Sequence, residues 1–341
     1  MSEASPGEAI AVLGAGSWGT ALGIQFARSG RHTLLWGRAE DDPAGMEKAR
    51  QNARYLPGAK FPPSLHAEPD LDKVLAVAPI VVVAVPSHAF RAVLTQMKPL
   101  MRPGTRLAWA TKGFELETGK LPHQVAREVL GPGTAMAVLS GPTFAREVGM
   151  GLPTAMTIAA NDEDYARQLA ENLSGESFRA YTSSDIVGVE VGGAVKNVLA
   201  IGAGICDGLG FGANTRVALI TRGLVEMTRL GVALGAQPAT FMGLAGMGDL
   251  VLTCTDDQSR NRRMGLALAA GKTVKEAERE IQQVVEGVLA AEAVHRVAAR
   301  AGVEMPICEQ IYRILYEGAE PKEAVVALMK RELKSEFAPG G

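Results

Sequence analysis

The first candidate for chemistry is a lysine in an apolar stretch. Lys196, followed by Asn197, interrupts the glycine-rich run from Val191 to Leu199. Burial of a charged amine is costly, and desolvation lowers the pKa of a lysine towards the working pH of a general acid or base. Lys196 is therefore the predicted proton carrier. The alternative is a lysine whose amine extends from a buried helix to solvent.

A second group of polar residues is suited to a phosphate. Arg260 stands between Ser259 and Asn261, so a guanidinium and two short polar side chains occur together. A phosphate dianion needs this combination of donors. Asp249, in the glycine-rich connection before them, could orient Lys196 or accept a hydrogen bond from a substrate hydroxyl. The alternative for this segment is a helix N-cap at Ser259 followed by exposed arginines.

A glycine-rich segment near the start of the chain predicts a dinucleotide site. Gly14, Gly16 and Gly19 form a G-x-G-x-x-G pattern between the apolar run Ala9–Leu13 and the helical pattern Ser17–Arg28. The first glycine permits a tight turn, the second lets backbone N–H groups approach a pyrophosphate, and the third allows close packing of helix on strand. A plain glycine turn is the alternative.

Arg38 indicates which dinucleotide the site prefers. It stands where an NAD site usually has an acidic residue for the ribose hydroxyls, and an arginine there suits a 2′-phosphate. The sequence therefore favours NADP(H), with NAD(H) as a further cofactor. The acidic residues at positions 40–42 weaken this inference, and a solvated surface arginine is the alternative.

Strands that alternate with helices must position these residues. Besides the first strand and helix, apolar runs predict strands at Thr33–Trp36, Ile80–Val85, Arg106–Ala110, Ala135–Leu139 and Thr154–Ala159. This alternation implies a parallel sheet covered on both faces. Lys112 follows one of the strands, and in such sheets ligands lie beyond the carboxyl ends of strands, so Lys112 would lie beside the nicotinamide. A surface turn lysine is the alternative.

From Val187 onward the pattern is helical and contains no convincing strand. We expect a short flexible tail at residues 1–8, a dinucleotide-binding domain at 9–186, an all-α domain at 187–334 and a second flexible tail at 335–341. The predicted helices of the second domain are Val217–Leu234, Arg263–Ala270, Thr273–Gln283, Leu289–Ala301, Ile307–Glu317 and Pro321–Lys330.

Composition excludes several classes of function. The formal charge of −2 provides no basic field for nucleic acid. Three widely spaced cysteines and the absence of a secretory signal predict a cytoplasmic protein, and no run is apolar and long enough to predict membrane insertion. No metal is expected, because no pair of ligands has suitable spacing among the five histidines, His32, His66, His88, His123 and His295.

In combination, these segments resemble the bacterial-type NAD(P)-dependent glycerol-3-phosphate dehydrogenases over nearly the whole chain. The motifs are G-A-G-S-W-G-T-A-L at 14–22, N-x-x-Y-L-P at 52–57, A-T-K-G at 110–113, S-G-P-T-F-A at 140–145, G-G-A-V-K-N at 192–197, L-A-G-x-G-D-L at 244–250, S-R-N at 259–261 and V-E-G at 285–287. The resemblance implies an α/β, doubly wound Rossmann-type N-terminal domain and an all-α C-terminal domain like that of 6-phosphogluconate dehydrogenase. It also implies a homodimer that reduces dihydroxyacetone phosphate to sn-glycerol 3-phosphate for phospholipid synthesis.

The resemblance also assigns residues. It implies cofactor contacts at Gly14, Gly16, Ser17, Trp18, Gly19, Arg38, Tyr55, Lys112, Ala145, Arg260, Val284 and Glu286. It implies substrate contacts at Lys112, Gly141, Thr143, Lys196, Asp249, Ser259, Arg260 and Asn261, with Lys196 as the proton acceptor when glycerol 3-phosphate is oxidised. Gly37 departs from the family pattern, in which many members have a polar residue before the arginine, and this departure bears on cofactor preference.

Two other functions remain as alternatives. A β-hydroxyacid dehydrogenase of the 6-phosphogluconate type shares both domains and a lysine acid/base, but its lysine usually stands in K-x-x-x-N, whereas Asn197 follows Lys196 directly. A non-catalytic NADP(H)-binding sensor is the second alternative, although such a protein would have no reason to keep Lys112, Lys196 and Asp249 near one crevice.

Overall fold

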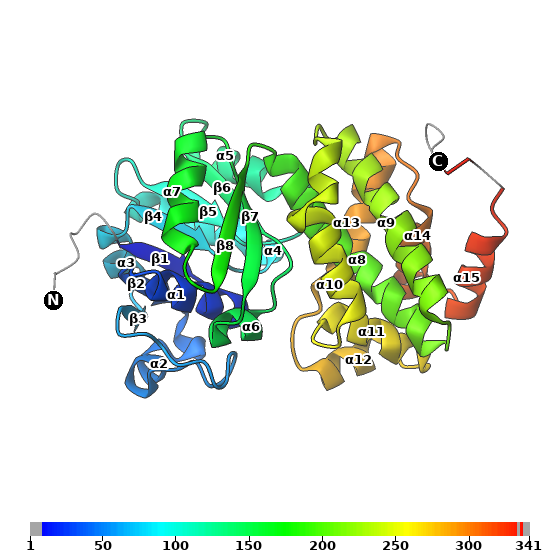
Figure 1. Cartoon of the computed structure of the whole chain (residues 1–341), viewed down its shortest axis with the longest axis horizontal. Helices are drawn as coiled ribbons and strands as arrows, with labels where there is room; N and C mark the ends of the chain where they lie inside the picture. Colours follow the sequence, from blue (N-terminus) through cyan, green and yellow to red (C-terminus); the bar gives the residue numbers. More distant parts are fainter. Residues whose placement is uncertain (1–8, 333–334, 337–341) are drawn as a thin grey trace. The chain divides into compact units, whose positions relative to one another are not determined.

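The computed structural model describes residues 9–332 and 335–336, which form two compact units (Figure 1). The first unit runs to Lys112 and resumes from Pro122 to Ile186; the second contains Gly113–Leu121 and the chain from Val187. The sequence-based division placed Gly113–Leu121 in the first domain. It groups with the second because Phe114 and Leu121 are buried in that unit's core. Of the expected flexible tails, only Ser335 and Glu336 lie among the described residues.

An eight-stranded sheet forms the centre of the first unit, in the spatial order β3-β2-β1-β4-β5-β6-β7-β8. The strands are β1 (Ile10–Leu13), β2 (Thr33–Trp36), β3 (Leu65–Glu68), β4 (Ile80–Val83), β5 (Arg106–Trp109), β6 (Met136–Ser140), β7 (Thr154–Ala160) and β8 (Phe178–Ser183). The strand order reverses direction at β1, between β2 and β4, and this is the switch point at which doubly wound sheets bind ligands. The doubly wound Rossmann-type fold is therefore confirmed.

Two features of the sheet differ from the expectation. Strand β7 runs antiparallel to β6, so the sheet is mixed rather than wholly parallel. Strands β3 and β8 were missed in the sequence, because both lie at sheet edges and carry polar residues in place of an apolar run. In β8, only Phe178 is buried.

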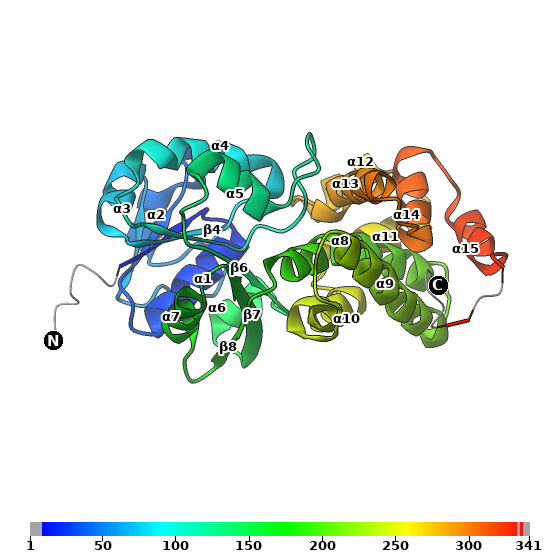
Figure 2. The same ribbon diagram turned by 90° about the horizontal axis from the view of Figure 1, so that it is seen from above.

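Helices cover both faces of the sheet (Figure 2). On one face lie α1 (Ser17–Arg28), α6 (Ala145–Met150) and α7 (Glu163–Leu173), and on the other lie α3 (Leu71–Val77), α4 (Ser87–Met97) and α5 (Pro122–Leu130). Helix α2 (Pro43–Ala49) and the 3-10 turns η1 (Ala39–Asp41) and η2 (Lys98–Leu100) complete the unit. These layers bury the apolar residues on both sides of the strands.

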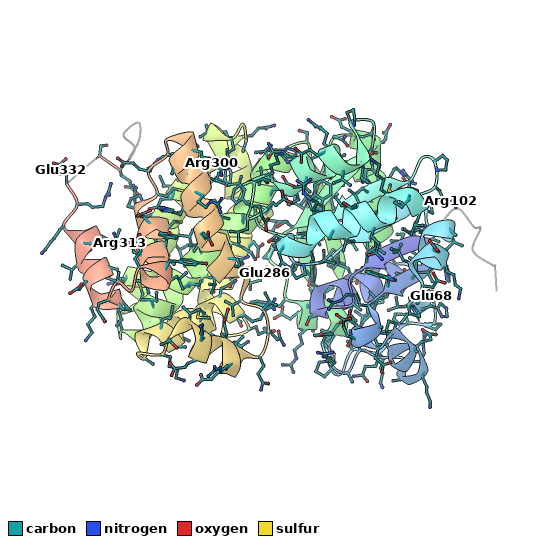
Figure 3. All side chains as sticks on the ribbon, turned by 180° about the vertical axis from the view of Figure 1, so that it is seen from behind. Glu68, Arg102, Glu286, Arg300, Arg313 and Glu332 are labelled. Atoms are coloured by element: carbon teal, nitrogen blue, oxygen red, sulfur yellow. The ribbon has the colours of Figure 1, made fainter. Side chains whose placement is uncertain are left out.

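The described residues of the second unit contain helices and no strand. They are α8 (Ile186–Gly208), α9 (Ala213–Ala233), η3 (Pro238–Met242), the π-helical turn η4 (Leu244–Gly248), α10 (Asp249–Thr255), α11 (Arg260–Ala269), α12 (Val274–Ile281), α13 (Glu286–Ala301), α14 (Pro306–Tyr316) and α15 (Pro321–Met329). Figure 3 shows Glu286 and Arg300 towards opposite ends of α13. The all-α second domain is thus confirmed.

Helix α8 forms the core of the second unit. It is the one helix in the described part of the chain that is long and apolar enough to cross a membrane, but most of it is buried inside the protein. Glycines bring α11 against it: a Cβ at Gly204 would lie 2.0 Å from the carbonyl oxygen of Arg262, and one at Gly265 would lie 2.0 Å from that of Ile201. The segment that begins α11 is therefore held against the helix that carries Lys196.

A buried carboxyl group joins α9 to α14. Glu226 is only 3% exposed, and its two oxygens accept hydrogen bonds from the backbone N–H groups of Ile307 at 2.7 Å and Cys308 at 3.2 Å. These donors belong to the first turn of α14, where backbone N–H groups lack helical partners. Burial raises the pKa of Glu226 to about 7, although the hydrogen bonds and Arg229 oppose this shift.

This pKa predicts that stability falls with rising pH. The pKa of Glu226 is higher in the folded chain than its ordinary 4.5, so the stabilising effect of the proton is complete below pH 4.5 and is lost as the pH rises through about 7. A shift of this size is worth about 3 kcal/mol. Measured between pH 5 and 8, the decline in the melting temperature should therefore be smaller in Glu226→Gln than in the wild type. The exposed control Glu278→Gln should retain the wild-type slope, and equal slopes in all three proteins would contradict the prediction.

Candidate active site

Lys196 is buried and paired with a carboxylate. Its Nζ donates to Oδ1 of Asp249 at 2.5 Å and to Oγ1 of Thr253 at 3.1 Å. The Lys196 side chain is 9% exposed and that of Asp249 only 1%. The simpler alternative, an amine extended to solvent, does not describe this geometry. A buried carboxylate at this distance favours the ammonium form of the lysine, so the pair holds a proton at a fixed place.

The π-helical turn η4 places the carboxylate opposite the lysine. It ends at Gly248 and continues directly into α10, whose first residue is Asp249. Thr253 lies one turn later on the same face, and its hydroxyl donates to the backbone oxygen of Asp249 at 2.5 Å. Thr253 was not among the residues predicted from the sequence. The four-residue spacing from Asp249 was the only signal that could have indicated it.

Two asparagines connect three helices of the second unit. Asn261 donates through Nδ2 to Oδ1 of Asn197 at 2.9 Å, and its own Oδ1 accepts from the backbone N–H of Gly287 at 2.9 Å. Asn197 in turn donates to Glu286 at 3.5 Å. The network joins α8, α11 and the first turn of α13, so the residues after Lys196 and Arg260 have fixed positions.

The Ser259–Asn261 segment begins helix α11. Ser259 is the N-cap, and its Oγ accepts from the backbone N–H of Arg262 at 3.2 Å, as the simpler alternative for this segment supposed. The serine is 4% exposed. Arg260 donates to the carbonyl oxygen of Val284 at 2.9 Å, which brings these two predicted cofactor contacts together. A capping role and a ligand-binding role are compatible, because the serine hydroxyl still carries its own hydrogen.

The three glycines of the first loop differ in what the fold requires of them. Gly14 has φ +117°, and a Cβ there would lie 2.5 Å from the oxygen of Ala84; a Cβ at Gly19 would lie 1.9 Å from the oxygen of Gly14. A Cβ at Gly16 would meet no atom within 4 Å. Folding therefore explains the first and last glycines, whereas open space beside Gly16 at the N-terminus of α1 fits an approaching pyrophosphate.

The neighbours of this loop include further predicted cofactor contacts. Ser17 Oγ donates to the backbone oxygen of Tyr55 at 2.6 Å, so the segment at residues 52–57 lies against the loop. Trp18 has a buried Nε1 without a hydrogen-bond partner. Buried N–H groups are rarely left unpaired, so this donor also fits a site that a ligand completes.

Arg38 lies after β2 and is engaged by carboxylates. It forms ion pairs with Glu40 at 2.8 Å and Asp41 at 3.3 Å, and its side chain is 61% exposed. The hydrogen bond with Asp41 raises the pKa of Arg38. A Cβ at Gly37 would lie 2.8 Å from that of Ala15, so the residue before Arg38 is small because the Gly14–Gly19 loop lies against it.

The remaining predicted contacts of the first unit lie near the ends of β5 and β6, which are neighbours in the sheet. Lys112 follows β5, and Gly141 follows β6 with φ +159°. Thr143 donates to the backbone oxygen of Gly141 at 3.2 Å, and Ala145 is the first residue of α6. The predicted residues therefore form separate groups within each unit, with Lys112 in the first and Lys196, Asp249 and Arg260 in the second.

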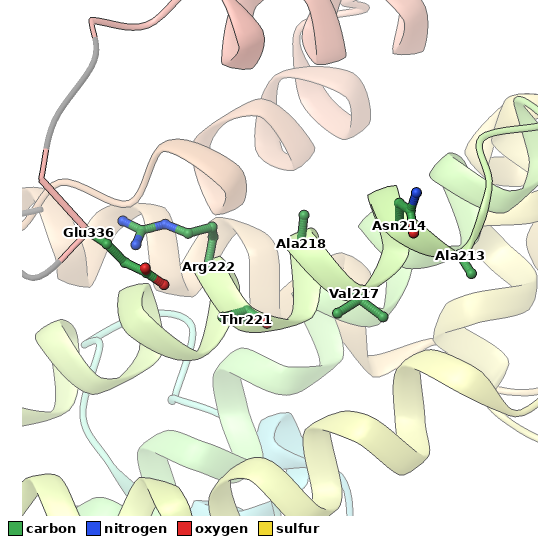
Figure 4. Close-up of a pocket in the computed structure, with 7 residues that line it drawn as sticks. All are labelled: Ala213, Asn214, Val217, Ala218, Thr221, Arg222 and Glu336. Carbon is green, nitrogen blue, oxygen red and sulfur yellow. The ribbon is translucent and has the colours of Figure 1, made fainter.

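One hollow on the second unit belongs to neither group. It has a volume of about 430 Å³ and lies along α9, as Figure 4 shows. Its lining residues are Ala213, Asn214, Val217, Ala218, Thr221, Arg222 and Glu336. None of them is a predicted site residue. Within the described residues, no group of three His, Cys, Asp or Glu side chains could hold a metal ion.

Comparisons with known proteins cover both units. Residues 9–166 match a family described as NAD-dependent glycerol-3-phosphate dehydrogenase N-terminus, and residues 185–326 match its C-terminus. A glycerol-3-phosphate dehydrogenase [NAD(P)+] of Aeromonas hydrophila is 59% identical over 96% of this chain and 98% of its own length. One from Escherichia coli is 56% identical over 96% and 97%.

A solved structure gives the same result for the fold. The crystal structure of glycerol-3-phosphate dehydrogenase from Coxiella burnetii has a TM-score of 0.92 and 47% identity, and the match covers 96% of this chain and 100% of that one. The matches therefore extend over the glycine loop of the first unit and the buried lysine of the second.

Proposed function

Because this chain belongs to the family of NAD-dependent glycerol-3-phosphate dehydrogenases, we propose that Lys196 carries the proton of the family's reaction. The enzyme interconverts dihydroxyacetone phosphate and glycerol 3-phosphate with NAD(P) as cofactor. The sensor and the 6-phosphogluconate-type enzyme, which the sequence left as alternatives, are therefore set aside. The observation that carries the proposal is the buried contact of Lys196 with Asp249.

The proton moves between Lys196 Nζ and the substrate oxygen. During reduction, the ammonium donates a proton to the oxygen of the carbonyl as negative charge develops there; during oxidation, the neutral amine accepts the hydroxyl proton. Asp249 stabilises the ammonium form, and Thr253 fixes the direction of the amine through its hydrogen bond. Lys112 polarises the carbonyl as a second positive charge.

The substrate phosphate is bound by groups that donate hydrogen bonds. Arg260 supplies the guanidinium, and Ser259 and Asn261 supply a hydroxyl and an amide. The hydrogen bonds of Asn261 to Asn197 and Gly287 support a fixed orientation for this segment. Gly141 and Thr143 contribute contacts from the first unit.

The cofactor is held mainly by the first unit. When bound, the reduced nicotinamide supplies the hydride. The Gly14–Gly19 loop holds the pyrophosphate with Ser17 and Trp18, while Tyr55, Lys112 and Ala145 contact the rest of the dinucleotide. Arg260, Val284 and Glu286 contribute contacts from the second unit. Arg38 binds the 2′-phosphate, which favours NADP(H) over NAD(H), although that phosphate competes with Glu40 and Asp41 for the guanidinium.

The proposed cellular role rests on the resemblance of the sequence to the bacterial-type enzymes of this family. We propose that the enzyme works in the direction of dihydroxyacetone phosphate reduction, for phospholipid synthesis, as a homodimer in the cytoplasm. Cys206, Cys254 and Cys308 are free and buried, which supports a reducing compartment.

An assay of four combinations of substrate and cofactor tests the proposed function. Wild-type enzyme should oxidise NADPH with dihydroxyacetone phosphate, with a kcat/KM above that for NADH. With dihydroxyacetone, which lacks the phosphate, kcat/KM should be at least ~100-fold lower because several charge-assisted hydrogen bonds are lost. The wild-type enzyme should not reduce NADP+ when 6-phosphogluconate is the substrate. Equal kcat/KM values for dihydroxyacetone phosphate and dihydroxyacetone would contradict the role of the Ser259–Asn261 segment, and a higher kcat/KM with NADH than with NADPH would contradict that of Arg38.

A further inference from the structure

A fully buried amide lies against the glycine loop of the first unit. Asn52 is 0% exposed and follows α2. Its Nδ2 donates to the backbone oxygen of Ala15 at 2.8 Å and to Oγ1 of Thr20 at 2.9 Å. Its Oδ1 accepts from the backbone N–H of Tyr55 at 3.1 Å. Both amide hydrogens and the amide oxygen are therefore in use, and the partners come from two separate segments.

We propose that Asn52 is a positioning residue that orients the loop for the dinucleotide pyrophosphate. This inference rests on the pyrophosphate role proposed above for the Gly14–Gly19 loop. Ala15 and Gly16 share one peptide group, and in a trans peptide the N–H points opposite to the C=O. Because Asn52 binds the Ala15 oxygen, the N–H of Gly16 is directed away from Asn52. The donor thus faces the opposite side of the loop from the buried amide.

A second contact fixes the start of helix α1. Thr20, also fully buried, lies in the first turn of α1, and its hydroxyl accepts the other amide hydrogen of Asn52. The backbone oxygen of Tyr55 accepts from Ser17 Oγ at 2.6 Å. Asn52 therefore connects the turn at residues 52–55 to both the loop and the helix. The N-terminus of this helix supplies the backbone donors and the dipole that attract a phosphate.

An amide is the side chain that this position requires. It has two donors and an acceptor in one plane, whereas an ionised carboxylate has no donor and a serine hydroxyl has only one. Replacement of the amide would remove the shorter of the two side-chain hydrogen bonds to the Ala15 oxygen and leave only the one from Oγ1 of Thr20 at 3.5 Å, so the peptide group that Ala15 shares with Gly16 would be held less firmly. A smaller polar residue would therefore fill the site without orienting the loop.

The test separates positioning of the pyrophosphate from general stability. In Asn52→Ala, the KM for NADPH should rise about tenfold, which corresponds to ~1.4 kcal/mol. The kcat at saturating NADPH and the KM for dihydroxyacetone phosphate should stay within about twofold, because Asn52 contacts no reacting group. The inhibition constant of adenosine 2′-phosphate, which has no pyrophosphate, should also be unchanged. Asn52→Ser, whose hydroxyl cannot reach both acceptors, should show the same pattern. This variant replaces Asn52→Ala in the test if the alanine variant does not fold.

A matched control replaces another buried amide of the same unit. Asn172 in α7 is 7% exposed, and Asn172→Ala should lower the melting temperature without a change in the KM for NADPH. Two results would overturn the proposal: a lower melting temperature of Asn52→Ala with an unchanged KM for NADPH, or an equal rise in the inhibition constant of adenosine 2′-phosphate. If Gly16→Ala also leaves the KM unchanged, the pyrophosphate role of the loop fails. If only the Asn52 variants have no effect, the positioning role alone fails.

Discussion

Replacement of Lys196 by methionine should lower kcat by about 10²- to 10⁴-fold, the usual contribution of a general acid or base. Methionine has a similar length and no ionisable group, so the change removes the proton and leaves most of the packing. The KM for NADPH should change little, because Lys196 is assigned to the substrate oxygen. Steady-state kinetics with dihydroxyacetone phosphate and NADPH would measure both values.

Stability must be separated from catalysis in this variant. Lys196→Met leaves Asp249 buried without its partner, and such a charge destabilises a protein by several kcal/mol. The double variant Lys196→Met/Asp249→Asn removes both charges and should recover the melting temperature but no activity. Addition of ethylamine to Lys196→Ala should restore part of the rate, because a small amine can occupy the vacated volume. A nearly wild-type kcat in Lys196→Met would refute the proton-transfer role of Lys196.

Replacement of Gly16 by alanine should lower kcat/KM for NADPH by roughly tenfold to hundredfold, which is the value of one charge-assisted hydrogen bond to a phosphate. The fold itself has room for the methyl group, since a Cβ at Gly16 meets no atom within 4 Å. The methyl would instead occupy the space in which the pyrophosphate approaches the backbone. The melting temperature should therefore stay close to that of the wild type while cofactor binding, followed by NADPH fluorescence, weakens.

The second unit offers a close control for this variant. Gly212 is the N-cap of α9 with φ −75° and ψ −178°, almost the same backbone conformation as Gly16 with φ −72° and ψ −178°. A Cβ at Gly212 also meets open space. Gly212→Ala therefore makes the same chemical change at the same kind of helix start, outside the proposed site. Equal loss of NADPH binding in both variants would show that the effect at Gly16 is not local.

The two predictions differ in how much of each could be derived from sequence. The glycine pattern between a strand and a helix is continuous in the chain, so its turn could be placed from sequence alone. The different requirements at Gly14, Gly16 and Gly19 only became separable from the atoms that surround each one. For Lys196, the sequence indicated an amine in an apolar helix but gave two outcomes, proton transfer or exposure to solvent. The position of Asp249 in the folded unit favours the first.

The sequence by itself determined the features that depend on neighbouring residues. Apolar runs placed six of the strands, helical periodicity marked the change to an all-helical second domain, and the motifs indicated the family. These patterns are local, because the periodicity of side chains follows directly from the geometry of a strand or helix. The edge strands β3 and β8 escaped this reasoning because solvent on one side removes the need for an apolar run.

Only the tertiary structure decided which distant residues meet. Thr253 lies 57 residues from its partner Lys196, and Asn52 lies 37 residues from Ala15. The assignment of Gly113–Leu121 to the second unit and the reversed direction of β7 are of the same kind. Each depends on how whole elements pack and where their side chains then point. No local pattern encodes this information, because the same polar residue satisfies a short-range pattern whether it faces solvent or a buried partner.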